Sequence, residues 1–293
     1  MTDINFRGTG VALVTPFNAR GEINFSSLEK IVNHVINGGV DYLVALGTTA
    51  ETPTLSEEEK EKVVSSIIKF NAKRVPIILG MGGNNTLALI ESIRNYDFSN
   101  IDGILSVAPY YNKPTQEGIY EHFKAVAEAS PLPIILYNVP GRTSSNISAE
   151  TCLKLALDFE NILAVKEASG DFSQVMEILR MKPKNFHVIS GDDAISLPMI
   201  SIGSSGVISV IGNAFPSEFS EMVRLTLNNS LDEARRIHYK LLPVIETMFA
   251  EGNPAGVKAF LKQINLCTEE VRLPLIKASN KLSKKVDEIL KEF

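Results

Sequence analysis

The sequence predicts a (β/α)8 barrel followed by a helical extension at the C-terminal end. Eight short apolar runs follow one another between residues 11 and 210, and each ends in small, polar or proline residues. Stretches with helical periodicity lie between the runs, and beyond residue 231 only the helical periodicity continues. Eight successive strand–helix units are typical of this barrel, whereas a doubly wound sheet usually has fewer units and a glycine-rich first turn.

The apolar runs have the length and composition of strands that are buried on both faces. The expected strands cover residues 11–15, 42–46, 76–80, 103–108, 133–137, 163–166, 187–190 and 206–210. The turn after the first run reads Thr15-Pro16-Phe17 and has no glycine pattern. This turn argues against the doubly wound sheet and therefore supports the barrel.

The stretches between the runs carry the signals of amphipathic helices. Leu28, Ile31 and Val35 recur at helical spacing. Ser56, followed by Glu59, predicts a capping box at the start of the next helix. Further helices are expected over residues 86–96, 115–129, 148–159, 172–181, 194–202 and 217–228.

We therefore expect residues 1–228 to form a catalytic barrel and residues 229–293 to form a C-terminal extension. Within the extension, helical spacing reaches Phe249, and Pro243 is expected to kink or break that helix. Two more helices are expected over residues 254–264 and 277–290. The extension can serve subunit contact or only cover the barrel, and the sequence leaves both interpretations open.

Composition narrows the class of protein. A hydrophobic content of 44% and a charged content of 22% are normal for a soluble globular chain. The net charge of −5 and the lack of a Lys/Arg-rich block argue against nucleic-acid binding. No apolar run approaches the ~20 residues of a membrane helix, and residues 1–10 lack the apolar core of a signal peptide. The cytoplasm is the expected location.

Polar side chains collect where the expected strands end, which is where barrel active sites lie. These strand-end residues include one lysine, several hydroxyl groups and two aspartates, namely Thr15, Thr48, Thr49, Tyr110, Tyr111, Tyr137, Lys166, Gly191, Asp192, Asp193 and Ile208. No histidine falls at a strand end, and Cys152 and Cys267 have no metal-ligand spacing. We therefore expect no metal and no cofactor.

Lys166 follows three apolar residues at the end of the sixth run. Lysine is rarely buried without a partner or a chemical task, so one interpretation is an amine nucleophile that forms a Schiff base with a carbonyl substrate. The alternative is a strand-end lysine that reaches solvent or pairs with Glu167. The tyrosines and threonines at neighbouring strand ends favour imine chemistry, because hydroxyl groups can pass protons without adding charge.

Five segments with a shared pattern lie at these strand ends. They read Gly-Thr-Thr-Ala-Glu over residues 47–51, Pro-Tyr-Tyr-Asn-Lys-Pro over 109–114, Tyr-Asn-Val-Pro-Gly-Arg-Thr over 137–143, Val-Lys-Glu-Ala-Ser-Gly over 165–170 and Ser-Gly-Asp-Asp over 190–193. In these segments the chain resembles the class I pyruvate aldolase/N-acetylneuraminate lyase superfamily and, within it, the dihydrodipicolinate synthase family. The resemblance runs from about residue 8 to the C-terminus.

The resemblance implies a reaction and a set of catalytic residues. Pyruvate would form an imine with Lys166, and the derived enamine would attack L-aspartate 4-semialdehyde on the way to diaminopimelate and lysine. Tyr137 would be the main proton carrier, with Thr48 and Tyr111 completing a hydroxyl relay. In the family Tyr111 is donated by the neighbouring subunit, and the assembly is usually a homotetramer built as a dimer of dimers.

The resemblance also implies the substrate-binding residues. Thr49 would hold the pyruvate carboxylate, and Gly191 and Ile208 would border the pyruvate. Arg142 would bind the carboxylate of the semialdehyde, since a guanidinium can make two parallel hydrogen bonds to a carboxylate. Sialic acid lyases usually lack this arginine. The alternatives are another pyruvate-dependent aldolase, acting on sialic acid or a keto-sugar acid, and a barrel that has no catalytic function.

Two departures from the family pattern affect the expectations. Ala50 stands where the family has a second glycine, so the carboxylate loop is expected to adjust if its backbone needs a positive φ there. The lysine feedback site is only partly present: Asn84 and Tyr110 match, whereas Ala88 replaces the glutamate that binds the effector's ammonium group. Glu57 and Lys60 replace its histidines. We expect weak or absent inhibition by lysine.

Overall fold

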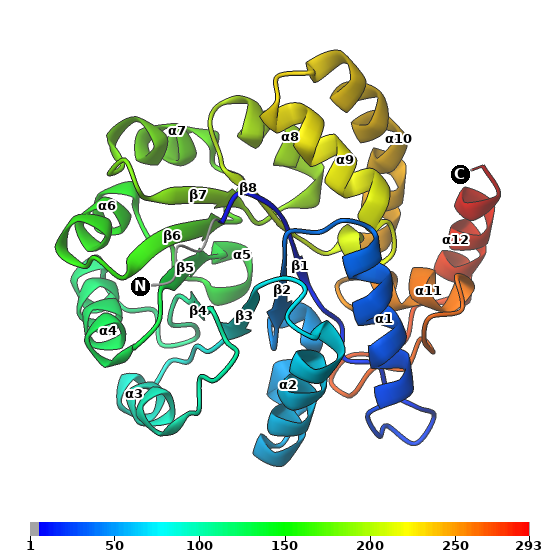
Figure 1. Cartoon of the computed structure of the whole chain (residues 1–293), viewed down its shortest axis with the longest axis horizontal. Coiled ribbons are helices and arrows are strands. Elements are labelled where there is room, and N and C mark those ends of the chain that lie inside the picture. The colour runs from blue at the N-terminus through cyan, green and yellow to red at the C-terminus, as the bar shows by residue number, and fades with distance from the viewer. Residues whose placement is uncertain (1–5, 293) are drawn as a thin grey trace.

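The computed structural model describes residues 6–292 and contains a closed barrel of eight parallel strands in the order of the sequence. Figure 1 shows the strands at the centre and a ring of helices around them. The strands are β1 (Gly8–Ala12), β2 (Tyr42–Ala45), β3 (Ile77–Gly80), β4 (Gly103–Val107), β5 (Ile134–Asn138), β6 (Ile162–Glu167), β7 (His187–Ser190) and β8 (Gly206–Ser209). The predicted (β/α)8 fold is confirmed.

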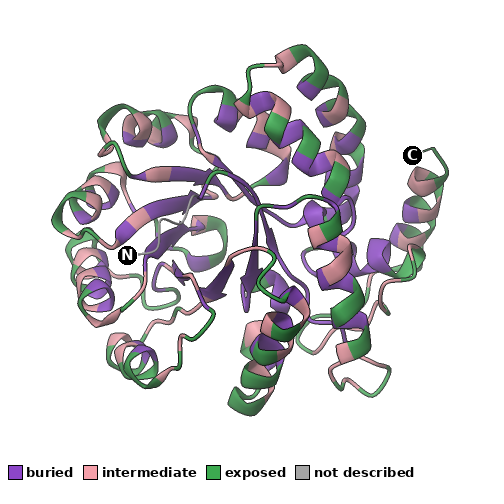
Figure 2. Ribbon diagram, in the orientation of Figure 1, coloured by how far each residue is buried: buried purple, intermediate pink, exposed green. Residues whose placement is uncertain are grey.

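Helices follow the strands along the chain, and most of them cover the outside of the barrel. They are α1 (Phe25–Asn37), α2 (Glu57–Asn71), α3 (Thr86–Asn95), α4 (Gln116–Ala129), α5 (Pro140–Thr143), α6 (Ala149–Asp158), α7 (Phe172–Met181), α8 (Ser196–Ser201) and α9 (Pro216–Leu227). The predicted capping box of α2 is present, with Ser56 and Glu59 bonding each other's backbone N–H groups. In Figure 2 the strands are buried, and the helices alternate between buried and exposed faces.

Side chains fill the interior of the barrel, so the barrel is a packed core rather than a channel. Large members of this interior layer are Phe6, Tyr42, Ile78, Ile135 and Ile208. A second apolar layer lies between the strands and the surrounding helices. The strand ends are consequently held between the interior layer and the outer layer. This packing gives side chains at the strand ends the rigidity that a catalytic site needs.

The first strand begins three residues earlier than predicted, at Gly8 instead of residue 11. Gly10 explains the difference, because a Cβ at this position would lie 2.1 Å from the ring of Tyr42. At Gly206, the register partner of Gly8 where β8 closes on β1, a Cβ would lie 2.0 Å from the Gly8 carbonyl oxygen. Close packing of backbones at this closure requires glycine, and glycine gives no apolar signal in the sequence.

The C-terminal extension comprises α10 (Leu231–Phe249), α11 (Ala255–Gln263) and α12 (Asn280–Glu292). Of the predicted kink or break at Pro243, the break does not occur, because α10 continues through this residue. Pro243 lies on the exposed side of the helix. Pro243 has no N–H to donate to the carbonyl of Tyr239. Tyr239 is a 65% exposed residue, so this missing helical hydrogen bond lies on the solvent side of α10.

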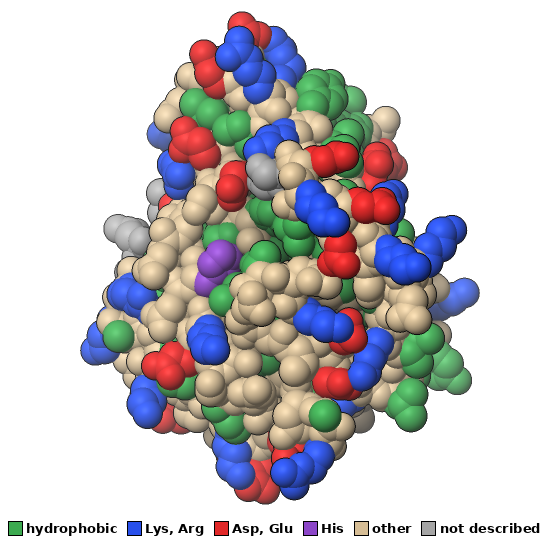
Figure 3. Space-filling model, turned by 90° about the vertical axis from the view of Figure 1, so that its right-hand side faces the viewer, with side chains coloured by type: hydrophobic (Ala, Val, Ile, Leu, Met, Phe, Trp, Pro, Cys, Tyr) green, Lys and Arg blue, Asp and Glu red, His purple; other side chains and the backbone are tan. Residues whose placement is uncertain are grey.

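The extension packs against the barrel through α10, which contacts α8 and α9, while α12 contacts α10 and α11. Figure 1 places α12 at the side of the ring of helices. Figure 3 views this side of the molecule and shows basic and acidic side chains interspersed over it. Within residues 6–292, none of the helices is both long and apolar enough to cross a membrane.

His122 in α4 predicts a pH dependence of stability. Its side chain is buried, its Nδ1 lies 2.8 Å from the hydroxyl of Thr86, and burial lowers its pKa from 6.5 to about 4. Because the folded pKa lies below the unfolded one, the unfolded chain binds more protons between these values. The free energy of unfolding should therefore fall by up to about 3 kcal/mol as the pH drops from 6.5 to 4.

Urea denaturation of the wild type and of His122→Asn at several pH values measures this contribution. Asp193 titrates in the same range in the opposite sense, because burial raises its pKa to about 6. Subtracting the free energy of unfolding of the variant from that of the wild type removes the contribution of Asp193, which both proteins share. The difference should shrink toward acid pH, and a difference that is constant from pH 7 to 4 would contradict the assignment to His122.

Candidate active site

Lys166 lies near the C-terminal end of β6 and is only 5% exposed. It is the register partner of Tyr137 on β5, and its Nζ lies 4.3 Å from the centroid of the Tyr137 ring. Across residues 6–292, no hydrogen bond or ion pair to the Lys166 amine is found. The buried amine is therefore available to an electrophile that enters beside Tyr137.

Glu167 is not the partner of Lys166. Successive side chains of a strand point to opposite faces, and the Glu167 carboxylate accepts hydrogen bonds from Asn138 Nδ2 at 3.0 and 3.2 Å. It also accepts from the Ser169 N–H at 2.8 Å and from Gln174 Nε2 at 2.9 Å. This buried network fastens the ends of β5 and β6 together and so sets the spacing of Tyr137 and Lys166.

The Glu167 network was missed by sequence reasoning, although one signal was present. Asn138 directly follows Tyr137, and Glu167 directly follows Lys166. Two residues that face the interior on adjacent strands are each followed by a polar residue that must face outward. Paired polar residues at that position, between a sheet and its covering helices, indicate a buried hydrogen-bond network.

Gly191 borders the lysine side chain, at the point where β7 ends. A Cβ at Gly191 would lie 2.7 Å from the Cβ of Ala168 and 3.1 Å from the Cε of Lys166. Its N–H donates to the carbonyl of Glu167 at 2.8 Å. Glycine thus leaves the space through which the stem of Lys166 passes. Ile208 on β8 is 1% exposed and belongs to the same interior layer as Tyr137.

The segment after β8 is held by Asp193, which follows β7. Its buried carboxylate oxygen Oδ2 accepts from the N–H groups of Val210 at 3.0 Å and Ile211 at 2.9 Å. Burial raises the pKa of Asp193 to about 6, and these hydrogen bonds act in the opposite direction. Asp193 thereby fixes the end of β8 close to Ile208.

The residues after β2 form a short 3-10 turn, η1 (Thr48–Ala50). Thr48 is exposed at the rim, whereas Thr49 is 2% exposed. In this segment Leu46 and Glu51 have a positive φ, of 53° and 56°, whereas Ala50 does not. Alanine in place of the family's glycine therefore causes no backbone strain, and the expected adjustment of this loop is not needed.

Tyr111 and Arg142 both lie at the surface of the single chain. Tyr111 is 88% exposed, with a φ of 73° in the turn after β4. This turn is held by Asn84, whose Nδ2 donates to the carbonyl of Tyr110 at 3.1 Å. Arg142 is exposed in α5, and the part of the chain that the structure describes offers its guanidinium no carboxylate. Within one chain, Tyr111 is thus not packed against the residues around Lys166.

The groups available for chemistry are one amine and several hydroxyls. Between residues 6 and 292, no three or more His, Cys, Asp or Glu side chains come together in a way that could hold a metal ion. Cys152 and Cys267 form no disulfide, and burial raises the pKa of the Cys152 thiol. An amine beside a phenol suits a carbonyl substrate, because the amine forms the covalent bond and the phenol moves the proton.

The fold and this site define a barrel enzyme of the class I aldolase type, in which a strand-end lysine is the candidate nucleophile. The chain belongs to the Dihydrodipicolinate synthetase family, whose model matches residues 5–293. A 4-hydroxy-tetrahydrodipicolinate synthase of Flavobacterium psychrophilum is 56% identical over 288 residues, which is 98% of each chain.

Solved structures agree with this assignment. A dihydrodipicolinate synthase from Aquifex aeolicus superposes with a TM-score of 0.94 at 42% identity, over 98% of each chain. A second structure, described as the first monomeric dihydrodipicolinate synthase variant, has a TM-score of 0.95 at 38% identity and covers 98% of this chain and 96% of its own. The similarity therefore extends over the barrel and the C-terminal extension together.

Proposed function

We propose that this chain works as a 4-hydroxy-tetrahydrodipicolinate synthase, a lyase that condenses pyruvate with L-aspartate 4-semialdehyde toward diaminopimelate and lysine. The family and the full-length relatives of that name support the reaction. One observation supports Lys166 as the nucleophile. Its amine is buried, has no hydrogen-bond or ion-pair partner among residues 6–292, and lies against the ring of Tyr137.

The reaction would begin with attack of the Lys166 Nζ on C2 of pyruvate. The C2 oxygen leaves as water, and the resulting imine loses a C3 proton to give an enamine. C3 of the enamine then attacks the aldehyde carbon of the semialdehyde, whose own amine closes the ring on C2 and displaces the lysine. Tyr137 would carry the protons, with Thr48 and Tyr111 linking it to solvent.

Both substrates carry a carboxylate, and the site offers a separate group for each. Thr49, with the N–H groups of the turn after β2, would bind the pyruvate carboxylate. Arg142 would bind the carboxylate of the semialdehyde, supported by its exposed guanidinium, which has no ion pair in the described part of the chain. This role of Arg142 would distinguish a 4-hydroxy-tetrahydrodipicolinate synthase from the pyruvate-dependent aldolases that act on sialic or keto-sugar acids.

The assembly that we propose is a homotetramer built as a dimer of dimers. Tyr111 is 88% exposed in the single chain, whereas the proposed relay requires its hydroxyl close to Tyr137. Donation of Tyr111 by a neighbouring subunit would meet this requirement. We also propose a cytoplasmic location, a division of the chain at residue 228 and weak or absent inhibition by lysine.

Borohydride reduction in the presence of pyruvate tests the proposed covalent step. Peptide mass mapping should find one reduced pyruvate on Lys166, because borohydride converts an imine into a stable secondary amine. Lys166→Ala should acquire no such adduct. Labelling at another lysine, or no labelling of the wild type, would contradict the assignment. A substrate panel with keto-sugar acids then distinguishes the sister aldolases, which would accept those acids in preference to the semialdehyde.

A further inference from the structure

We infer that Asn253, in the C-terminal extension, is a positioning residue for the carboxylate of pyruvate because it fixes the direction of the Thr49 hydroxyl. The inference rests on the proposed function and extends it to a segment outside the barrel strands. Asn253 lies between α10 and α11 and is 8% exposed. Its Nδ2 donates a hydrogen bond to the Oγ1 of Thr49 at 2.9 Å, in buried surroundings.

The direction of this hydrogen bond has a chemical consequence. A threonine hydroxyl has one hydrogen to donate and two lone pairs that accept. Because Asn253 occupies a lone pair of Thr49, the hydroxyl hydrogen points elsewhere, and it is given to no other group that the structure describes. A substrate carboxylate, which only accepts hydrogen bonds, is the matching partner. Asn253 thus makes Thr49 a donor toward the proposed carboxylate position.

A buried ion pair holds the extension against this loop. Glu51, two residues after Thr49, and Lys258 on α11 are fully buried, and Lys258 Nζ lies 2.5 Å from Glu51 Oε1. Lys258 also donates to the carbonyl of Glu270 at 2.8 Å. Glu51 and Lys258 are 207 residues apart in sequence. Their pairing fixes α11, and with it Asn253, relative to the turn that carries Thr49.

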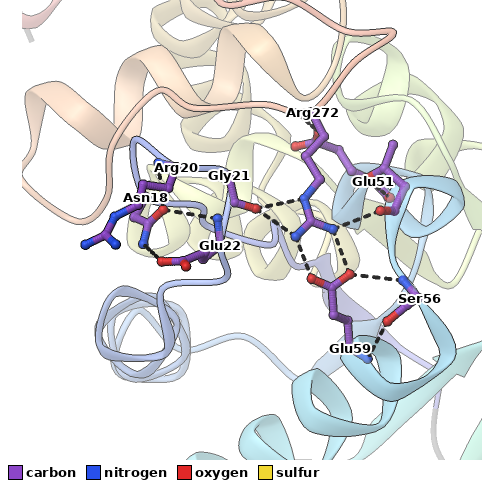
Figure 4. Close-up of polar contacts among 9 residues, drawn as sticks. Asn18, Arg20, Gly21, Glu22, Glu51, Ser56, Glu59 and Arg272 are labelled. Atoms are coloured by element: carbon purple, nitrogen blue, oxygen red, sulfur yellow. Dashed lines mark hydrogen bonds and ion pairs between the residues drawn. The ribbon is translucent and has the colours of Figure 1, made fainter.

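Arg272 adds a second connection between the same two parts of the chain. Its backbone N–H donates to Glu51 Oε2 at 2.8 Å. Its guanidinium makes a bidentate pair with Glu59 on α2, at 2.5 and 2.7 Å, and also donates to the carbonyls of Gly21 and Thr54. Figure 4 shows Arg272 reaching both Glu59, in the first turn of α2, and Gly21, in the loop before α1. The loop after β2 is therefore fastened on both sides of Glu51.

Lys258 and Arg272 also share an aromatic neighbour. The Nζ of Lys258 lies 4.3 Å from the ring centroid of Phe17, and the guanidinium carbon of Arg272 lies 4.4 Å from it. Phe17 itself is buried in the segment after β1. Cation–π contacts of this kind restrain both cations, so the extension, the segment after β1 and the loop after β2 pack together around Phe17 and Glu51.

A double-mutant cycle of Asn253→Ala and Thr49→Val tests the inference with steady-state kinetics. Each single variant should raise KM for pyruvate about tenfold, with kcat within about twofold of wild type and KM for the semialdehyde unchanged. If Asn253 acts through the Thr49 hydroxyl, the double variant should be no worse than Thr49→Val alone. Gln263→Ala, at the exposed end of α11, is the matched control and should leave both KM values unchanged.

Asn253→Asp keeps the shape of the side chain and so guards against a fold that Asn253→Ala disrupts. A carboxylate can only accept from Thr49, which turns the hydroxyl hydrogen away from pyruvate, and it also repels the substrate. KM for pyruvate should rise about a hundredfold and should increase with pH as the introduced carboxyl ionises.

Three outcomes would overturn the inference. An unchanged pyruvate KM in Asn253→Asp would mean that Thr49 donates to Asn253 rather than to substrate. Additive effects in the cycle would mean that Asn253 acts without Thr49. If the wild type forms no borohydride-trapped adduct at Lys166, the proposed function fails and the inference fails with it. Normal trapping by the wild type, combined with additive effects, would overturn the inference alone.

Discussion

Replacing Lys166 by alanine is expected to lower kcat/KM by at least about 10⁴-fold, which is the scale of loss when a covalent nucleophile is removed. No other lysine can take over, because the amine must stand beside the proton carrier, and Lys166 Nζ lies 4.3 Å from the Tyr137 ring. The activity is measured with pyruvate and L-aspartate 4-semialdehyde in a coupled assay. Circular dichroism shows whether the variant is folded.

Two controls make the Lys166 result specific. Lys184→Ala removes an exposed lysine just before β7, at the opposite end of that strand from the candidate site, and should keep full activity. Lys166→Arg keeps a positive charge but has no amine that can form an imine, so it should be as inactive as Lys166→Ala. Activity above a tenth of wild type in either Lys166 variant would exclude this residue as the nucleophile.

The second large effect is expected at the buried ion pair. Lys258→Met removes the cation while keeping most of the side-chain volume. It leaves Glu51 as a fully buried carboxylate that still accepts a hydrogen bond from the backbone N–H of Arg272 but has lost its ion pair. Breaking a buried pair in this way should lower the free energy of unfolding by about 3–5 kcal/mol. Urea denaturation at pH 7.5, followed by circular dichroism, measures the loss.

The charges, and not the volume, should account for this loss. The double variant Lys258→Met/Glu51→Gln, which buries no unpaired charge, should recover part of the lost stability. Lys62→Met breaks an exposed ion pair with Glu58 and should hardly change the free energy of unfolding, because solvent screens exposed pairs. The proposed energetics would be refuted if Lys258→Met were no less stable than Lys62→Met.

Local signals in the sequence were sufficient for the barrel and for the position of the candidate nucleophile. Strands and helices depend on periodicity and capping within a few residues, and the Ser56–Glu59 capping box forms as expected. The location of Lys166 at the end of a buried strand follows from the same local pattern. The start of β1 was missed because the backbone packing that requires Gly10 involves Tyr42, which lies on another strand.

The contacts that support the site could not be predicted in this way. Asn253 and Thr49 are 204 residues apart, and nothing in the neighbourhood of either residue indicates that they meet. Whether Lys166 is free to form an imine or is paired with Glu167 depends on which face of the sheet each side chain occupies. The structure shows that the Glu167 carboxylate accepts hydrogen bonds from Asn138 instead. Contacts between residues so far apart in sequence are fixed by tertiary packing and produce no periodic pattern in the sequence.

The tie between Glu51 and the C-terminal extension bears on how the polypeptide matures. Synthesis runs from the N-terminus, so all eight strands leave the ribosome before Lys258 and Arg272. Until Lys258 and Arg272 have been synthesised, a nascent barrel would hold Glu51 without its counter-charge, and the turn after β2 would lack the contacts that fix it. The segment that completes the turn carrying Thr49 would therefore be made after the barrel strands.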